Sequence, residues 1–127
     1  MEFDIFYAIT HLIYTLDRYN ERRIAARLLP DEYVFLRRKL KQAIAEDDPE
    51  IVGESLDCLK SAGLERDPDV LAGEQYLISA QRPDGSWVED PDDPYTVFHA
   101  AWTGIDGLRD YRFHGKVRRM PVLKPLL

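Results

Sequence analysis

The stretch "GEQYLISAQRPDGSW", Gly73 to Trp87, runs from an amphipathic segment into a glycine turn that closes on a tryptophan. Apolar residues at helical spacing lead up to Gln81, and Pro83-Asp84-Gly85 is typical of a turn. Because the end of a helix leaves carbonyl groups unpaired, the Gln81 side chain can hydrogen-bond across to the start of the next helix. The indole of Trp87 can cover the same junction and donate its N–H to a carbonyl. We therefore expect this stretch to join two successive helices.

Three Asp-Pro pairs mark the starts of helices, at Asp48-Pro49, Asp67-Pro68 and Asp93-Pro94. An aspartate at the N-cap followed by proline at the first helical position is a typical helix start. We expect the first of these helices to stop at Gly63, the second near Gln81 and the third near residue 111. Two earlier helices are expected over residues 4–19 and 31–46. The predicted fold is all-α, with about five helices in antiparallel hairpins and no strand.

The two earlier helices differ in pattern. Residues 4–19 are apolar on nearly every side, which predicts a helix surrounded by neighbours. Residues 31–46 place Leu36 and Leu40 on one face and Arg37 and Arg38 on the other, which predicts a surface helix.

Composition indicates one domain over residues 1–111, followed by a basic, proline-containing tail over residues 112–127. A single cysteine, Cys58, excludes an intrachain disulfide, and together with the lack of a signal-peptide pattern it favours a cytoplasmic location. The least charged run, residues 5–16, is too short to span a membrane. The net charge of −6 argues against nucleic-acid binding. Acidic residues gather in 46–93 and basic ones in 18–41, which predicts solvated helix faces, with docking between copies as the alternative.

The pattern of the opening stretch resembles the QW repeat motif of the triterpene cyclases and the related repeats of protein prenyltransferase β-subunits. The residues that carry the resemblance are Gly73, Tyr76, Gln81, Gly85 and Trp87. The sequence departs from the motif at Ala72, where those families usually have Lys or Arg. The resemblance implies a partial α/α-toroid-like repeat. Because five helices are less than half of a closed ring of about twelve, a partner chain or another copy is expected to complete it.

The Phe98-His99 pair is similar to an aromatic-His step on the inner helices of prenyltransferase β-subunits. The resemblance implies a zinc site formed by Asp57, Cys58 and His99. Adjacent residues such as Asp57 and Cys58 point about 100° apart on a helix, which makes a shared metal awkward. We therefore expect no cofactor, with zinc at these three residues as the alternative.

Candidate ligand-binding residues lie on two of the expected helices. The first helix places Tyr7, His11 and Tyr14 on one stripe, where His11 is interpreted as a hydrogen-bonded core residue or as one side of a ligand site. The fifth offers Phe98, His99, Trp102 and Asp106. Residues 90–93 spell the Asp-x-Asp-Asp string of proton-initiated terpene cyclases, but prolines flank them, so we interpret them as a helix cap.

Three functions agree with these patterns, and no catalytic motif is complete. The first is a small helical-repeat binding or accessory protein that holds an apolar ligand or partner segment on its inner-helix face and is not catalytic alone. The second is a subunit or half of a prenyltransferase-like or terpenoid-cyclase-like enzyme. The third is a purely structural oligomerisation module.

Overall fold

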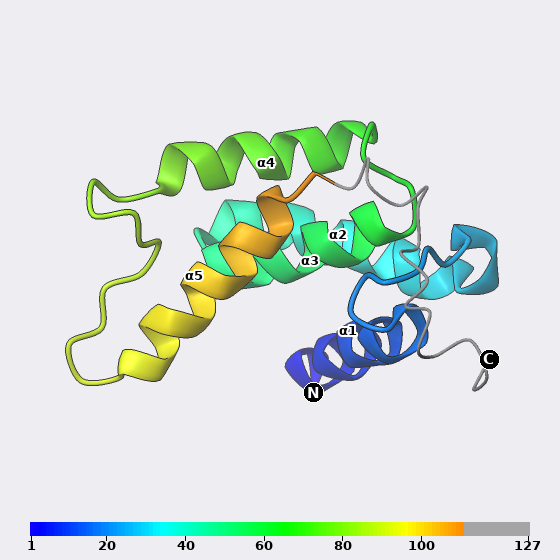
Figure 1. Ribbon diagram of the computed structural model, residues 1–127, viewed down its shortest axis with the longest axis horizontal. Helices are drawn as coiled ribbons and strands as arrows, with labels where there is room; N and C mark the ends of the chain where they lie inside the picture. Colours follow the sequence, from blue (N-terminus) through cyan, green and yellow to red (C-terminus); the bar gives the residue numbers. More distant parts are fainter. Residues whose placement is uncertain (111–127) are drawn as a thin grey trace, which may run out of the picture.

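The computed structural model describes residues 1–110, which form five α-helices and one short 3-10 helix, with no strand among them (Figure 1). The elements follow in the order α1 (Glu2–Asp17), η1 (Ala26–Leu28), α2 (Pro30–Glu46), α3 (Pro49–Ser61), α4 (Pro68–Ala80) and α5 (Pro94–Leu108). The all-α prediction is confirmed. The expected domain boundary at residue 111 and the basic tail over 112–127 lie outside the described residues. In residues 1–110, none of the helices combines the length and the apolar character that crossing a bilayer requires.

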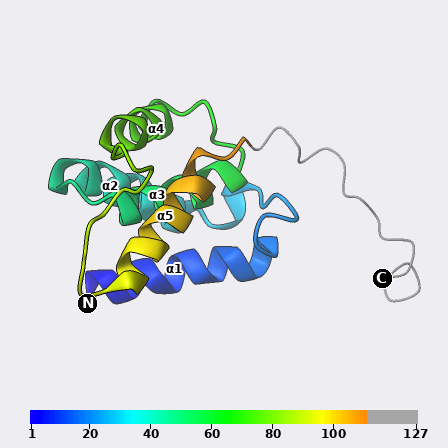
Figure 2. The same cartoon turned by 60° about the vertical axis from the view of Figure 1, so that its left-hand side comes forward.

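Helix α3 occupies the centre of the molecule. It packs against each of the other four α-helices, and every residue from Val52 to Ser61 is buried. Helices α2, α3 and α4 run back and forth, and α1 and α5 lie on the remaining sides of α3 (Figures 1 and 2). The largest fully buried apolar side chains come from four helices: Phe6, Ile13, Leu36, Leu40, Val52, Leu56, Leu59, Val70 and Leu77.

Helices α3 and α5 approach closely enough for their backbones to touch. A Cβ added to Gly53 would lie 2.5 Å from the carbonyl oxygen of Thr103, and one added to Gly107 would lie 2.9 Å from the carbonyl oxygen of Gly53. Any side chain larger than hydrogen at these positions would push the helices apart. This contact fixes the position of α5 on α3.

All three Asp-Pro pairs begin helices, as predicted. The Asp48 side chain accepts from the backbone N–H of Ile51, and the Asp67 side chain accepts from that of Asp69. Asp93 caps α5 through two backbone N–H groups. At the end of α3, Gly63 has φ 86°, and Leu64 N–H donates to the Leu59 carbonyl at 3.2 Å. This left-handed glycine ends the helix in the way its position in the sequence predicts.

The Gly73–Trp87 stretch joins α4 to α5. The indole N–H of Trp87 donates to the Leu77 carbonyl at 2.8 Å, which confirms the predicted donation, and the buried ring packs against Gly104 of α5. Gln81 acts differently from the prediction, because its Nε2 donates to the Gly85 carbonyl at 3.0 Å within the loop. At the other end of the motif, Tyr76 donates to Asp47 at 2.7 Å. The tryptophan, rather than the glutamine, links the two helices.

The prediction that the first helix is surrounded is wrong. Ile5, Leu12 and Leu16 are 42–45% exposed, since α1 packs through one face only. The helix also ends at Asp17, two residues earlier than predicted, because three consecutive residues from Arg18 to Asn20 have left-handed φ values of 53–71°. The surrounded helix is α3.

Candidate functional site

Polar side chains line the region where α3 lies between α1 and α5, and we call this region the polar seam. Acidic residues at spacings of four and three residues place Glu50, Glu54 and Asp57 on one face of α3. The polar seam consists of these three residues, His11 and Tyr14 of α1, and His99 and Asp106 of α5. It therefore contains four of the seven predicted ligand-binding residues.

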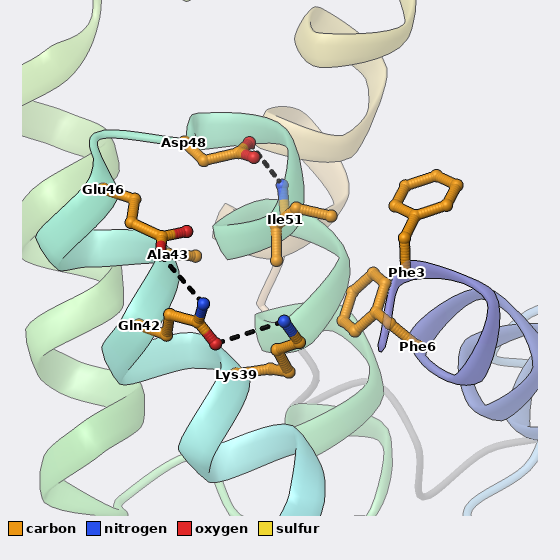
Figure 3. Close-up of a pocket in the computed structure, with 8 residues that line it drawn as sticks. All are labelled: Phe3, Phe6, Lys39, Gln42, Ala43, Glu46, Asp48 and Ile51. Atoms are coloured by element: carbon orange, nitrogen blue, oxygen red, sulfur yellow. Dashed lines mark hydrogen bonds between the residues drawn. The ribbon is translucent and has the colours of Figure 1, made fainter. Parts of the chain in front are cut away.

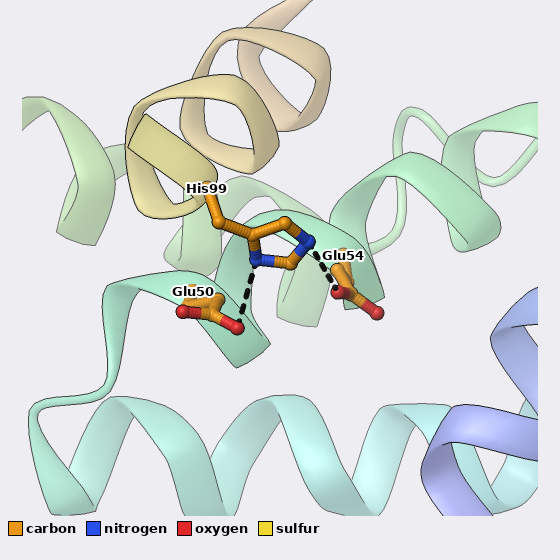
Figure 4. Close-up of side chains that lie close together, drawn as sticks. All are labelled: Glu50, Glu54 and His99. Atoms are coloured by element: carbon orange, nitrogen blue, oxygen red, sulfur yellow. Dashed lines mark ion pairs between the residues drawn. The ribbon is translucent and has the colours of Figure 1, made fainter. Parts of the chain in front are cut away.

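His99 lies between two glutamates of α3 (Figure 4). Its Nδ1 is 2.9 Å from Oε1 of Glu50, and its Nε2 is 3.9 Å from Oε1 of Glu54. The ring also stacks on Tyr95 of α5 at a centroid distance of 5.4 Å. One imidazole thus faces two carboxylates.

Glu54 is the buried member of this group, with 9% of its side chain exposed. Burial raises the pKa of Glu54 above its usual range, against the opposing effects of His99, Thr10 and His11. Its Oε2 atom is buried and has no hydrogen-bond partner among the described residues. Buried carboxylate oxygens normally have hydrogen-bond partners, so this atom is a buried acceptor that is left unsatisfied.

Asp57 occupies the other end of the polar seam. Asn20 Nδ2 lies 3.2 Å from both of its carboxylate oxygens, and Arg109 lies 3.7 Å from Oδ1. Burial and the nearby Asp106 raise the pKa of Asp57 to about 7, although Asn20 and Arg109 oppose the shift. Asp57 therefore carries a proton more readily than an ordinary aspartate.

Helix α1 brings a second imidazole to the seam. The Nδ1–H of His11 donates to the Tyr7 carbonyl at 2.9 Å, and the ring stacks on Tyr7 at 3.7 Å and meets Tyr14 edge-on at 5.7 Å. Burial and the neighbouring Cys58 raise the pKa of Tyr14 well above its usual range. His11 and His99 both lower the pKa of Glu54, so the two helices that carry them converge on one carboxylate.

The remaining predicted aromatic residues lie outside the polar seam. Phe98 and Trp102 are 59% and 55% exposed, and their rings contact each other at 5.8 Å. Tyr7 is 54% exposed on the outer side of its stack with His11. The predicted face therefore divides into an inner polar part and an outer apolar part.

The structure does not bring together the three residues of the predicted zinc site. Asp57 pairs with Asn20, while Cys58 is fully buried in the hydrophobic core. Burial raises the pKa of the Cys58 thiol well above its usual range, so the thiol stays protonated. Of the predicted three, only His99 belongs to a group of three potential ligands that could reach one ion among residues 1–110.

The Asp-x-Asp-Asp string acts as a cap, in agreement with its interpretation. The Asp90 side chain accepts from the backbone N–H groups of Asp92 and Asp93, and Asp93 accepts from Tyr95 and Thr96. The hydroxyl of Thr96 is the main cause that lowers the pKa of Asp93. An exposed, ionised carboxylate does not suit the protonation of an alkene.

A cavity of about 180 Å³ lies between the start of α1, the end of α2 and the start of α3 (Figure 3). Its lining combines apolar and charged side chains: Phe3, Phe6, Lys39, Gln42, Ala43, Glu46, Asp48 and Ile51. Pockets for drug-sized apolar ligands span about 300–1,000 Å³ and carry few charges. This cavity suits water or a small polar solute better than an apolar ligand.

Comparison of the chain with protein-family models, with curated proteins and with solved structures yields no match.

The polar seam contains residues that sequence reasoning did not select. Glu50 and Glu54 belong to a long acidic stretch whose pattern predicts a solvated face, and Asn20 lies between the first two predicted helices. One feature of the sequence indicates that this face is buried. Glu50, Glu54 and Asp57 share it with Gly53, and a glycine allows a neighbouring helix to approach closely, as α5 does here. That face is buried by α1 and α5.

Proposed function

We propose that the protein is a small helical binding module, not catalytic alone, that holds an apolar partner segment along the outer faces of α5 and α1. The proposed segment is a helix of a second copy of this chain. The observation that supports it is the exposed stripe of α5, where Tyr95, Phe98, Trp102 and Ile105 are 55–65% exposed. Their spacing of three, four and three residues places them on one face of the helix.

The exposed apolar area is large for a monomer. An aromatic side chain carries about 150–250 Å², so the four residues of the α5 stripe expose roughly 400 Å². Helix α1 exposes further apolar side chains on two opposite faces, Phe3 and Tyr7 on one and Ile5, Leu12 and Leu16 on the other, so only one of these sets can join the same interface. Both views place the starts of α1 and α5 on the same, lower side of the molecule (Figures 1 and 2). The α5 stripe alone supplies about half of the roughly 800 Å² per partner of a standard interface, and one face of α1 adds to it.

The charge distribution supports a protein partner. Helix α5 contains one charged residue, Asp106, among its 15 residues, although 31% of the chain is charged. Helix α2, by contrast, carries seven charged residues among 17. An exposed helix without charges is typical of an interface, and Tyr, Trp and Phe are enriched at such surfaces.

The experiment measures the mass of the protein by light scattering over a range of concentrations. We expect a dimer for the wild type and a monomer for Ile105→Glu, because the variant places an unpaired charge in an apolar interface. The control is Ile78→Glu on α4, whose side chain is 60% exposed against 63% for Ile105. A wild type that stays monomeric up to about 100 μM, a concentration that detects associations as weak as about 5.5 kcal/mol, would refute self-association through α5.

The two alternative functions also require a partner surface. A half of a prenyltransferase-like or cyclase-like enzyme would use the apolar faces to meet the chain that carries the missing repeats, whereas an oligomerisation module would have no further task. The Trp87–Leu77 hydrogen bond links α4 to α5. It supports the split-enzyme alternative, since the QW resemblance rests on that tryptophan. A dimer that is broken by Ile105→Glu would support the binding or oligomerisation functions over the split enzyme.

A further inference from the structure

Glu50, Glu54 and His99 form a group of three potential metal ligands outside the apolar faces proposed to bind a partner (Figure 4). One ligand atom from each lies within 4.8 Å of the other two. The two glutamates are one helical turn apart on α3, and the histidine comes from the second turn of α5. The close backbone contact of α3 with α5 at Gly53 holds the two sides together.

The group has more negative charge than the other residues described, 1–110, compensate. Two carboxylates face one imidazole, and even a protonated imidazole can neutralise only one of them. Within residues 1–110, the ion pairs of Glu50 and of Glu54 are both with His99, and neither glutamate pairs with a lysine or an arginine. An ionised carboxylate buried to this degree needs a positive partner or a proton.

Two polar atoms of the group have no hydrogen-bond partner in the part of the chain that the structure describes. One is Oε2 of Glu54, whose side chain is 9% exposed. The other is Nδ1 of His99, which lies near Glu50 without the alignment of a hydrogen bond. A buried polar atom without a partner is one that a cation would satisfy.

We propose that Glu50, Glu54 and His99 bind one divalent transition-metal ion through one carboxylate oxygen from each glutamate and one imidazole nitrogen. Nitrogen and oxygen donors of intermediate hardness suit zinc, manganese, iron(II) and cobalt(II) rather than a thiolate-seeking ion such as copper(I). Three protein ligands leave at least one coordination position for water or another ligand.

The site closes around an ion by small side-chain movements. Zinc lies about 2.0–2.2 Å from its nitrogen and oxygen ligands, so the ligand atoms must approach to roughly 3.5 Å of one another. Glu54 is fixed by burial, whereas the side chains of Glu50 and His99 are 30% and 24% exposed. These two can rotate toward Glu54, and their exposure also gives an ion its path from solvent. The proposed site shares His99 with the set predicted from sequence and replaces Asp57 and Cys58 by the two glutamates.

The test titrates the full-length protein with zinc in a calorimeter and with cobalt(II) in an absorption spectrometer. We expect one ion per chain, visible cobalt bands typical of nitrogen and oxygen ligands, and a higher melting temperature with zinc. The variants Glu50→Gln, Glu54→Gln and His99→Gln are each expected to lose at least about tenfold in zinc affinity, since each removes a ligand. Circular dichroism checks that each variant folds. Glu50→Gln is the variant that least perturbs the core, because its side chain is partly exposed.

The matched control is His114→Gln, which removes a histidine outside the described residues. It is expected to bind zinc like the wild type. Two results would overturn the proposal. One is a wild type that binds no stoichiometric zinc or cobalt, which would leave the group as an ion pair only. The other is binding that His114→Gln abolishes while folded Glu50→Gln and His99→Gln retain it.

Discussion

A methyl group on Gly53 has no room, because α5 crosses α3 at this point. The added Cβ would lie 2.5 Å from the carbonyl oxygen of Thr103 and 2.6 Å from its carbonyl carbon. Ordinary contacts begin at 3.4 Å, and these neighbours are backbone atoms that cannot rotate away. In Gly53→Ala, α5 must therefore move by nearly 1 Å or strain must remain at the crossing.

The expected loss of stability is about 2 kcal/mol. Overpacking a close contact costs about 1–3 kcal/mol, occasionally more, and a shifted α5 also loses part of its packing on α3. Alanine gains up to about 1 kcal/mol over glycine inside a helix, which offsets part of the cost. For a domain of this size, a net loss of about 2 kcal/mol corresponds to a fall in melting temperature of roughly 8 °C.

Gly73→Ala is the matched control. Gly73 is also buried in a helix, but an added Cβ would meet the ends of the Leu56 and Leu40 side chains at 2.8 and 3.0 Å. Those methyl groups can rotate, so we expect a change within about 1 kcal/mol. The gain in helix propensity is common to both variants and cancels in their difference.

Urea unfolding followed by circular dichroism measures the free energy of unfolding of both variants. Equal slopes of this free energy against urea concentration would indicate that the same amount of surface is exposed on unfolding. If Gly53→Ala were as stable as the wild type or more stable, the backbones of α3 and α5 would not be in contact. The same result would mean that no close backbone contact between α3 and α5 holds His99 opposite the two glutamates of α3.

Three further predictions concern single side chains. Because burial raises the pKa of Asp57 from 3.8 to about 7, the folded protein keeps that proton to higher pH than the unfolded chain, and stability falls as pH rises from about 4 to 7. Asp57→Asn is expected to lack this dependence, so its stability relative to the wild type should rise by up to about 4 kcal/mol between pH 4 and 8 in urea unfolding; an unchanging difference would contradict the shift. Trp87→Phe removes the 2.8 Å donor to the Leu77 carbonyl, which still accepts from the Gln81 N–H at 3.1 Å, and should cost about 0.5–1.5 kcal/mol, whereas a neutral result in thermal unfolding would show that the indole hydrogen bond adds no stability. Asp93→Ala removes the cap of α5 and should cost about 1 kcal/mol in the same assay, while Asp92→Ala, whose side chain caps nothing, should match the wild type.

The ends of the helices were predictable because their causes are local. An aspartate before a proline satisfies the first N–H groups of its own helix, and Gly63 adopts the left-handed conformation that ends α3. Neither depends on the rest of the fold. The end of α1 was missed, since three left-handed residues from Arg18 to Asn20 include no glycine to signal them.

The identity of the central helix was not predictable from hydrophobic pattern. Helix α3 carries Glu54, Asp57 and Lys60, all buried, and its sequence suggests a partly exposed helix. Their partners come from distant parts of the chain: Lys60 donates to Glu74 at 2.7 Å and to the Gly107 carbonyl at 3.0 Å. These partners lie 14 and 47 residues from Lys60 along the chain, so the pairings produce no periodic pattern in the sequence. For the same reason His99 was selected as a candidate but its glutamate neighbours were not.

The two proposals meet at Tyr95, which stacks on His99, but Ile105 and His99 lie on different sides of α5 and the proposals can fail separately. At 100° per residue, Ile105 lies about 120° around the helix from His99, and its side chain is 63% exposed while that of His99 faces α3. The crossing at Gly53 fixes the inner side of α5 whether or not a partner covers the outer side. We therefore expect Ile105→Glu to bind zinc as tightly as the wild type even if it becomes monomeric. Titration calorimetry on the variant measures this. Loss of zinc affinity together with loss of the dimer would show instead that association organises the metal ligands, because a coupling between two binding events must act in both directions.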